Sequence, residues 1–179
     1  MSAALNNDAS SSGAMLDVYL DGLKNAHALE KQATQLISRQ LERLQNYPEV
    51  EQLLRRHLGE TEQQIGRLDE ILASFGESHS TLKDIATSIT GNMAALGHTV
   101  MGDEILKNHF ANHAFENFEI ASYVSLITMA EATGHSAHVS PLRMTLSEEE
   151  RTAQAIREMT PDLTRKYLQR YAAGEKADR

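Results

Sequence analysis

Apolar residues recur every three or four positions along most of the chain, the spacing of amphipathic helices. The pattern predicts four long helices, over residues 15–46, 48–75, 103–133 and 136–160. Pro48 stands where a helix begins, Gly134 follows the third helix, and Pro161 is expected to end the fourth. A short final helix is predicted over 163–172. We see no strand pattern, so the expected fold class is all-α.

The segment between the second and third helices has a weaker pattern. Residues 81–98 have helical spacing that Gly91 and Gly97 interrupt, and we expect a short helix followed by a linker. This crossover would carry the chain across a four-helix bundle. The bundle domain is predicted over 15–173. A polar, disordered lead-in over 1–14 and a tail over 174–179 would flank it.

Composition narrows the possible functions. The net charge of -8 disfavours nucleic acid as a partner, because phosphate binding needs a basic surface. The chain has no cysteine, which excludes thiolate metal sites and cysteine nucleophiles and fits a cytoplasmic protein. No apolar run approaches the ~18 residues of a membrane span. We predict no catalytic residue and no cofactor-binding motif such as a phosphate loop.

Carboxylates occupy positions that the apolar stripes reserve for hydrophobic residues. Each long helix has at least one near its middle, and helix two adds an imidazole and an amide. The inward polar residues are Glu30, His57, Glu60, Gln64, Glu116, Glu119 and Glu149. A buried unpaired carboxylate costs several kcal/mol or takes up a proton. A cation is the simplest partner for several of them.

Oxygen ligands with one imidazole suit iron, manganese or magnesium better than zinc. Di-iron bundles place a Glu on two helices and a Glu-x-x-His pair on each of the other two. Here helix two has the reversed order His57-x-x-Glu60, and helix three has Glu116-x-x-Glu119. Helix four offers Glu149 alone, because we expect Glu148 to be solvated like Glu150.

Three stretches resemble a known family. HLGETEQQIGRL, FENFEIASY and NAHALEKQ are similar to the YciF/YciE-type ferritin-like proteins, a bacterial stress-associated group, over about residues 16–160. The resemblance implies a dimer of four-helix-bundle subunits with a di-metal centre and no well-established reaction. By position, the five inward glutamates match the carboxylates of that centre, and His57 and Gln64 match polar positions beside them.

The chain departs from that family at four positions. His27 replaces a usual tyrosine, and Ala153 replaces an acid on the metal face. Asn117 and Phe118 replace a histidine and a tyrosine, and by helical geometry they point away from the metals. Tyr123 is expected either to bond an acid of the centre or to be an ordinary core residue.

Other histidines are better explained as surface residues: His98, His109, His113, His135 and His138. The alternative for His109 and His113, which share the Glu116 face, is an entrance relay or an outer metal site. The first hypothesis is therefore a ferritin-like protein with two iron or manganese ions per chain, bound by Glu30, His57, Glu60, Glu116, Glu119 and Glu149. It would oxidise Fe(II) with oxygen or peroxide, or dispose of peroxide, and form a homodimer. The alternative is a non-catalytic helical stress or scaffold protein with a degenerate or empty metal site.

Overall fold

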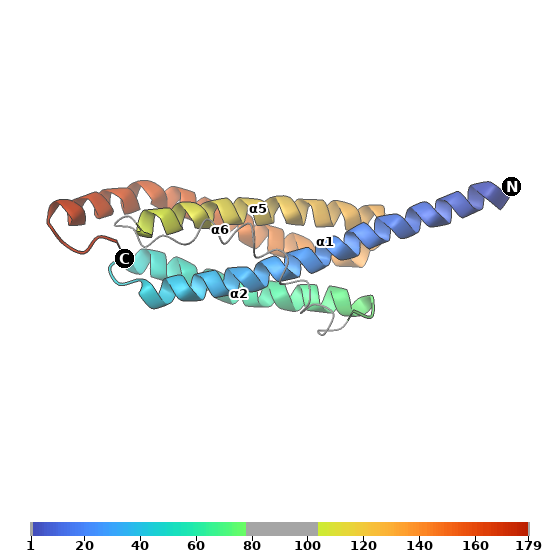
Figure 1. Cartoon of the computed structure of the whole chain (residues 1–179), viewed down its shortest axis with the longest axis horizontal. Helices are drawn as coiled ribbons and strands as arrows, with labels where there is room; N and C mark the ends of the chain where they lie inside the picture. The colour runs from blue at the N-terminus through green and yellow to red at the C-terminus, as the bar shows by residue number, and fades with distance from the viewer. Residues whose placement is uncertain (1, 78–103, 179) are drawn as a thin grey trace.

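A computed structural model describes residues 2–77 and 104–178 as a bundle of helices (Figure 1). The helices are α1 (Ser2–Arg43), α2 (Pro48–Ser74), α5 (Glu104–Ala132) and α6 (Ser136–Ala172). No strand occurs among these residues, so the predicted all-α bundle is confirmed. The predicted crossover helix lies outside the described residues.

Short turns make α1 with α2, and α5 with α6, antiparallel neighbours. Pro48 begins α2, where its missing N–H is unneeded. Gly134 has φ 78° in the turn before α6, a backbone conformation that glycine adopts without strain. α1 also packs against α5, and α2 against α6. The four helices therefore surround one common interior.

The first helix starts earlier than the sequence predicted. α1 begins at Ser2, whereas we expected a disordered lead-in before Met15. The segment contains no proline, and a single Gly13 costs only about 1 kcal/mol in a helix. This part of α1 projects beyond the other three helices (Figure 1). A bundle boundary at residue 15 therefore stays a prediction.

The fourth helix does not stop at Pro161, so the prediction of a separate C-terminal helix was wrong. α6 runs unbroken through Pro161 to Ala172. Proline removes one backbone hydrogen bond, but Leu163 beyond it is 1% exposed and packs into the core beside Tyr47. Apolar burial past the proline maintains the helix.

The interior has apolar ends and a polar middle. One apolar cluster, around Tyr19, Leu68 and Leu126, fills one end of the bundle. Another, around Ile37 and Leu163, fills the other end. The inward carboxylates lie on the helix segments between these clusters, so the apolar packing on both sides fixes the helices that carry them.

The last residues fold back on the bundle. The Tyr47 hydroxyl donates to the Ala177 carbonyl over 2.6 Å, and the Ile105 N–H donates to the Asp178 carbonyl over 2.9 Å. The predicted tail is thus docked across the α1–α2 turn and the first turn of α5.

Candidate metal centre

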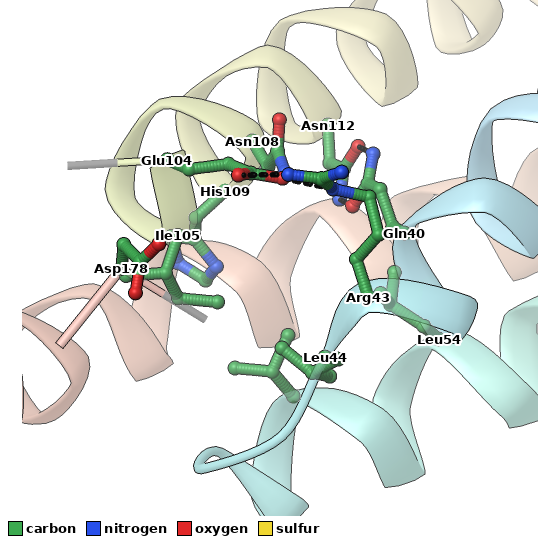
Figure 2. Close-up of a pocket in the computed structure, with 11 residues that line it drawn as sticks. Gln40, Arg43, Leu44, Leu54, Glu104, Ile105, Asn108, His109, Asn112 and Asp178 are labelled. Atoms are coloured by element: carbon green, nitrogen blue, oxygen red, sulfur yellow. Dashed lines mark hydrogen bonds and ion pairs between the residues drawn. The ribbon is translucent and has the colours of Figure 1, made fainter. Parts of the chain in front are cut away.

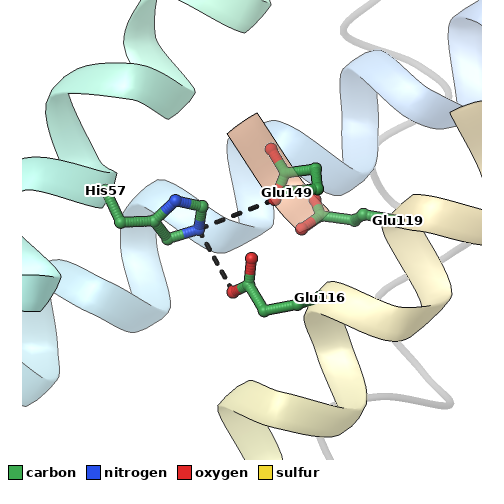
Figure 3. Close-up of side chains that lie close together, drawn as sticks. All are labelled: His57, Glu116, Glu119 and Glu149. Carbon is green, nitrogen blue, oxygen red and sulfur yellow. Dashed lines mark ion pairs between the residues drawn. The ribbon is translucent and has the colours of Figure 1, made fainter. Parts of the chain in front are cut away.

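Four buried side chains from three helices meet inside the bundle (Figure 3). His57 comes from α2, Glu116 and Glu119 from α5, and Glu149 from α6. One ligand atom of each lies within 4.8 Å of the others. Their exposures are 1%, 3%, 0% and 0%. All four were predicted from the sequence to point inward.

Local helix geometry explains the convergence. Glu116 and Glu119 are three residues apart, so they lie on one face of α5. The surrounding helix is mostly apolar and offers them no charged partner of its own. His57 lies between Leu53 and Leu68 in the apolar stripe of α2, and Glu149 lies between Leu142 and Ile156 on α6. Packing these stripes together forces the polar groups into one space.

The group contains more acceptors than donors. His57 Nε2 is 3.1 Å from Glu116 Oε1 and 4.0 Å from Glu149 Oε2. Both buried oxygens of Glu119 lack a hydrogen bond, as does Glu149 Oε2. Such orphaned oxygens are expensive unless a cation or a proton satisfies them. One imidazole nitrogen and three carboxylates fit a transition-metal ion, so this group can hold one.

The pKa values show how strongly the interior resists negative charge. Burial, then the charges of Glu30 and Glu149, raises the pKa of Glu119 well above 4.5. Burial and the adjacent Glu116 raise the pKa of Glu149 to about 10. Burial disfavours the His57 cation, but the nearby Glu116, Glu60 and Glu149 outweigh it and raise the pKa of His57 to about 10. Without a cation, this interior therefore favours the protonated forms of its acids.

Glu30 lies beside this group but outside it. It is 1% exposed, and the Tyr123 hydroxyl donates to its Oε1 over 2.5 Å. Burial raises the pKa of Glu30 to about 7, and Tyr123 partly counteracts this rise. Of the two alternatives for Tyr123, the bond to an acid is the one observed.

Glu60 also lies outside the four-residue group. Its Oε2 is 4.0 Å from His57 Nδ1, and its Oε1 accepts from Arg151 Nη2 over 2.7 Å. Thr152 Oγ1 is 3.4 Å from the same His57 nitrogen. Glu60 thus stands behind the imidazole, and its role as a ligand stays a prediction.

Glu148 was expected to be solvated, and this prediction was wrong. Arg67 binds both of its oxygens, at 2.6 and 2.7 Å. The Gln64 amide donates to Glu148 Oε2 over 3.1 Å and also to Glu149 Oε1. Gln64 therefore links the Arg67–Glu148 pair to the centre. Arg67 follows Gln64 by three residues on the same face of α2. That spacing was the available sequence signal that Arg67 lies near the same acids as Gln64.

The predicted surface histidines divide into two kinds. His109 is 2% exposed, and its Nε2 lies 2.8 Å from the Ile156 carbonyl, so the surface prediction was wrong for it. His113, His135 and His138 are partly buried, and His98 lies outside the described residues. His27 faces Asp69 on α2, with 3.1 Å between Nε2 and Oδ1, and not the carboxylate group.

His109 also lines a small pocket at the end of the bundle near the C-terminus (Figure 2). Across the pocket, Arg43 binds both oxygens of Glu104 at 2.7 Å. Gln40 and Asn112 exchange two amide hydrogen bonds. His109 is seven residues before Glu116 on α5, about 10 Å along the helix. None of the four residues of the buried group lines this pocket.

Comparison with known proteins identifies the family. The model of a domain of unknown function, DUF892, matches residues 14–169. The chain belongs to the DUF892 family. One relative, protein YciF of Escherichia coli strain K12, is 31% identical over 144 residues, covering 76% of this chain and 84% of YciF. The resemblance to YciF-type proteins is thus confirmed.

Solved structures agree with this assignment. A protein of Xanthomonas campestris pv. campestris superposes with a TM-score of 0.74 at 25% identity, covering 88% of this chain and 99% of that one. The E. coli stress protein YciF gives a TM-score of 0.66 at 25% identity, covering 83% and 95%. The bundle of this DUF892 chain is therefore shared with YciF. Among residues 2–77 and 104–178, no helix has the length and hydropathy that a membrane span requires.

Proposed function

We propose that this protein binds a pair of iron or manganese ions among its inward carboxylates and acts in oxygen or peroxide chemistry during stress. One observation carries the proposal: Glu119 is fully buried, both its oxygens lack a donor, and it stands beside an imidazole and two more acids. A bundle selected only for stability would place an apolar residue there.

The chain's residues have distinct roles in this proposal. Glu116, Glu119, Glu149 and His57 Nε2 form the first binding position. Glu30, held by Tyr123, and Glu60 are the remaining carboxylates for a second ion. Bound iron or manganese would supply the redox chemistry with a small oxidant. The surrounding apolar clusters exclude bulk water, and the Gln64 amide orients Glu149.

The role in stress is inferred from E. coli YciF, which is described as a stress protein. We place the protein in the cytoplasm, because a chain without cysteine suits a reducing compartment.

We further propose a homodimer formed through the outer face of α5. Phe110, Phe118 and Val124 there are 52%, 54% and 50% exposed. Between residues 110 and 130 the only acidic side chains are Glu116 and Glu119, which point inward, and no Lys or Arg occurs. A second copy fits this face best, because two chains of net charge -8 repel each other elsewhere.

Metal analysis tests the main proposal. Protein purified without chelator should retain about two Fe or Mn per chain, as in the di-metal bundles. Glu116→Gln and Glu119→Gln variants should lose them, and the exposed Glu150→Gln variant should not. Equal metal content in all four proteins, or none in the wild type, would contradict the proposal and favour the scaffold alternative.

A further inference from the structure

The six predicted metal ligands differ in their access to solvent. The side chains of His57, Glu116 and Glu149 are at most 4% exposed, and Glu30 and Glu119 are buried. The Glu60 side chain is 15% exposed. A cation coming from solvent would therefore reach Glu60 before any of the others.

Glu60 connects the surface to the interior. Its Oε1 accepts from Arg151, whose side chain is 53% exposed. Its Oε2 is buried, lacks a hydrogen bond, and lies 4.0 Å from His57 Nδ1. The Glu60 carboxylate thus lies at the boundary between solvent and the interior, where it pairs with one exposed cation.

Two neighbouring contacts close the bundle more firmly than the Arg151–Glu60 pair does. On the α1–α5 side, Leu29, Ala33 and Phe115 form an apolar cluster. Further along the α2–α6 side, Arg67 binds Glu148 through two nitrogens, and both side chains are about as buried as Glu60. Arg151 binds Glu60 through a single nitrogen. An exposed single-bonded ion pair opens easily, so this pair is the weakest closure on that side.

We propose that the Arg151–Glu60 ion pair is a latch over the entrance to the metal centre, with Glu60 as the first carboxylate that binds an incoming divalent cation. The inference rests on the proposed function, since it assumes that the interior group binds metal. When Arg151 swings into solvent, Glu60 attracts the cation. From Glu60 the cation is transferred to the interior group of His57, Glu116, Glu119 and Glu149. Return of Arg151 covers the entrance.

Binding kinetics test the latch without any assay of activity. Metal-free protein is mixed with Co(II) in a stopped-flow instrument, and the absorption of the bound ion is followed. Arg151→Ala is compared with Arg143→Ala. Arg143 lies elsewhere on α6, its side chain is 63% exposed, and it pairs with Glu131 of α5. Both variants lose one positive charge, so any effect of net charge on association is shared. Circular dichroism checks that each variant is folded.

The latch predicts that Arg151→Ala binds Co(II) at least threefold faster than Arg143→Ala, and that it also releases Co(II) faster to excess EDTA. Glu60→Gln should bind at least threefold more slowly than wild type, although it also frees Arg151. Equal association rates in the two arginine variants would overturn the latch while leaving the metal centre intact. If wild-type protein binds no Co(II), both the latch and the proposed function fail.

Discussion

The Tyr123 hydroxyl donates a hydrogen bond to Glu30 Oε1 over 2.5 Å and so joins α5 to α1 beside the carboxylate group. Both residues are 1% exposed. Burial, then the charge of Glu30, raises the pKa of Tyr123 well above 10, so the phenol keeps its proton. Glu30 Oε2 lacks a hydrogen bond in the structure, which leaves Tyr123 as the donor that holds this carboxylate.

Replacing this phenol should therefore destabilise the metal-free protein. Tyr123→Phe leaves Glu30 Oε1 buried without its donor, which costs about 1–3 kcal/mol in the free energy of unfolding. Urea titration at pH 7 measures it. Tyr171→Phe, at a tyrosine that is 67% exposed, should change the value by less than about 0.5 kcal/mol. A similar change in both variants would show that the Tyr123–Glu30 bond contributes nothing specific.

Glu119 should destabilise the metal-free protein and contribute to metal binding. In the metal-free protein, Glu119 either stays charged in an apolar interior or takes up a proton that it lacks in the unfolded chain, and both cost free energy that a neutral glutamine avoids. Glu119→Gln should therefore raise the free energy of unfolding of the metal-free protein. Calorimetric titration with Mn(II) should show at least a tenfold weaker affinity. The exposed Glu150→Gln should change neither quantity. A destabilised Glu119→Gln with unchanged affinity would mean that Glu119 is a structural residue.

The metal-free protein should lose stability as pH rises from 7 to 9. His57 titrates near 6.5 and Glu149 near 4.5 in an unfolded chain, but the folded state raises both pKa values to about 10. The folded protein therefore keeps protons that the unfolded chain has released. Each such proton lowers the free energy of unfolding by about 1.4 kcal/mol per pH unit. Urea titrations across this range measure the slope.

The same titrations on Glu149→Gln should give a shallower slope, because one retained proton is removed. A slope of zero or a rise in stability in the wild type would mean that the buried group does not hold protons in the absence of metal.

The α5 face should control self-association. Phe118→Glu puts a charge at the centre of the uncharged face, and two such charges would meet across a symmetric contact. Size-exclusion chromatography with light scattering should show a dimer for the wild type and a monomer for this variant. Leu168→Glu, at a 57% exposed position on α6, should remain dimeric. A dimer in all three proteins would place the interface elsewhere.

The helical pattern predicted the helices well and their ends less well. The periodicity of apolar residues shows which face of each helix is buried, and this holds however the helices are arranged in a bundle. Helix ends depend on packing beyond the local sequence. Pro161 looked like a stop because it lacks an N–H, yet burial of Leu163 among residues of three other helices outweighs that loss.

The candidate site shows the same division. Acids inside apolar stripes were predictable, since each position follows from its own helix. The partners of Glu148 and His109 could not be predicted from the sequence, because Arg67 and the Ile156 carbonyl lie on neighbouring helices. The relative rotation and axial shift of two helices are set by packing. Placing Glu60 outside the four-residue group also required that geometry.

Glu119 is buried without a hydrogen-bond donor, and this also has an evolutionary consequence. A lineage that stopped using the ion would gain stability from almost any neutral replacement there, so drift would remove this acid early. Glu119 is thus a marker residue. Among relatives that share the bundle, its presence or absence should separate those that kept the chemistry from those that kept only the architecture.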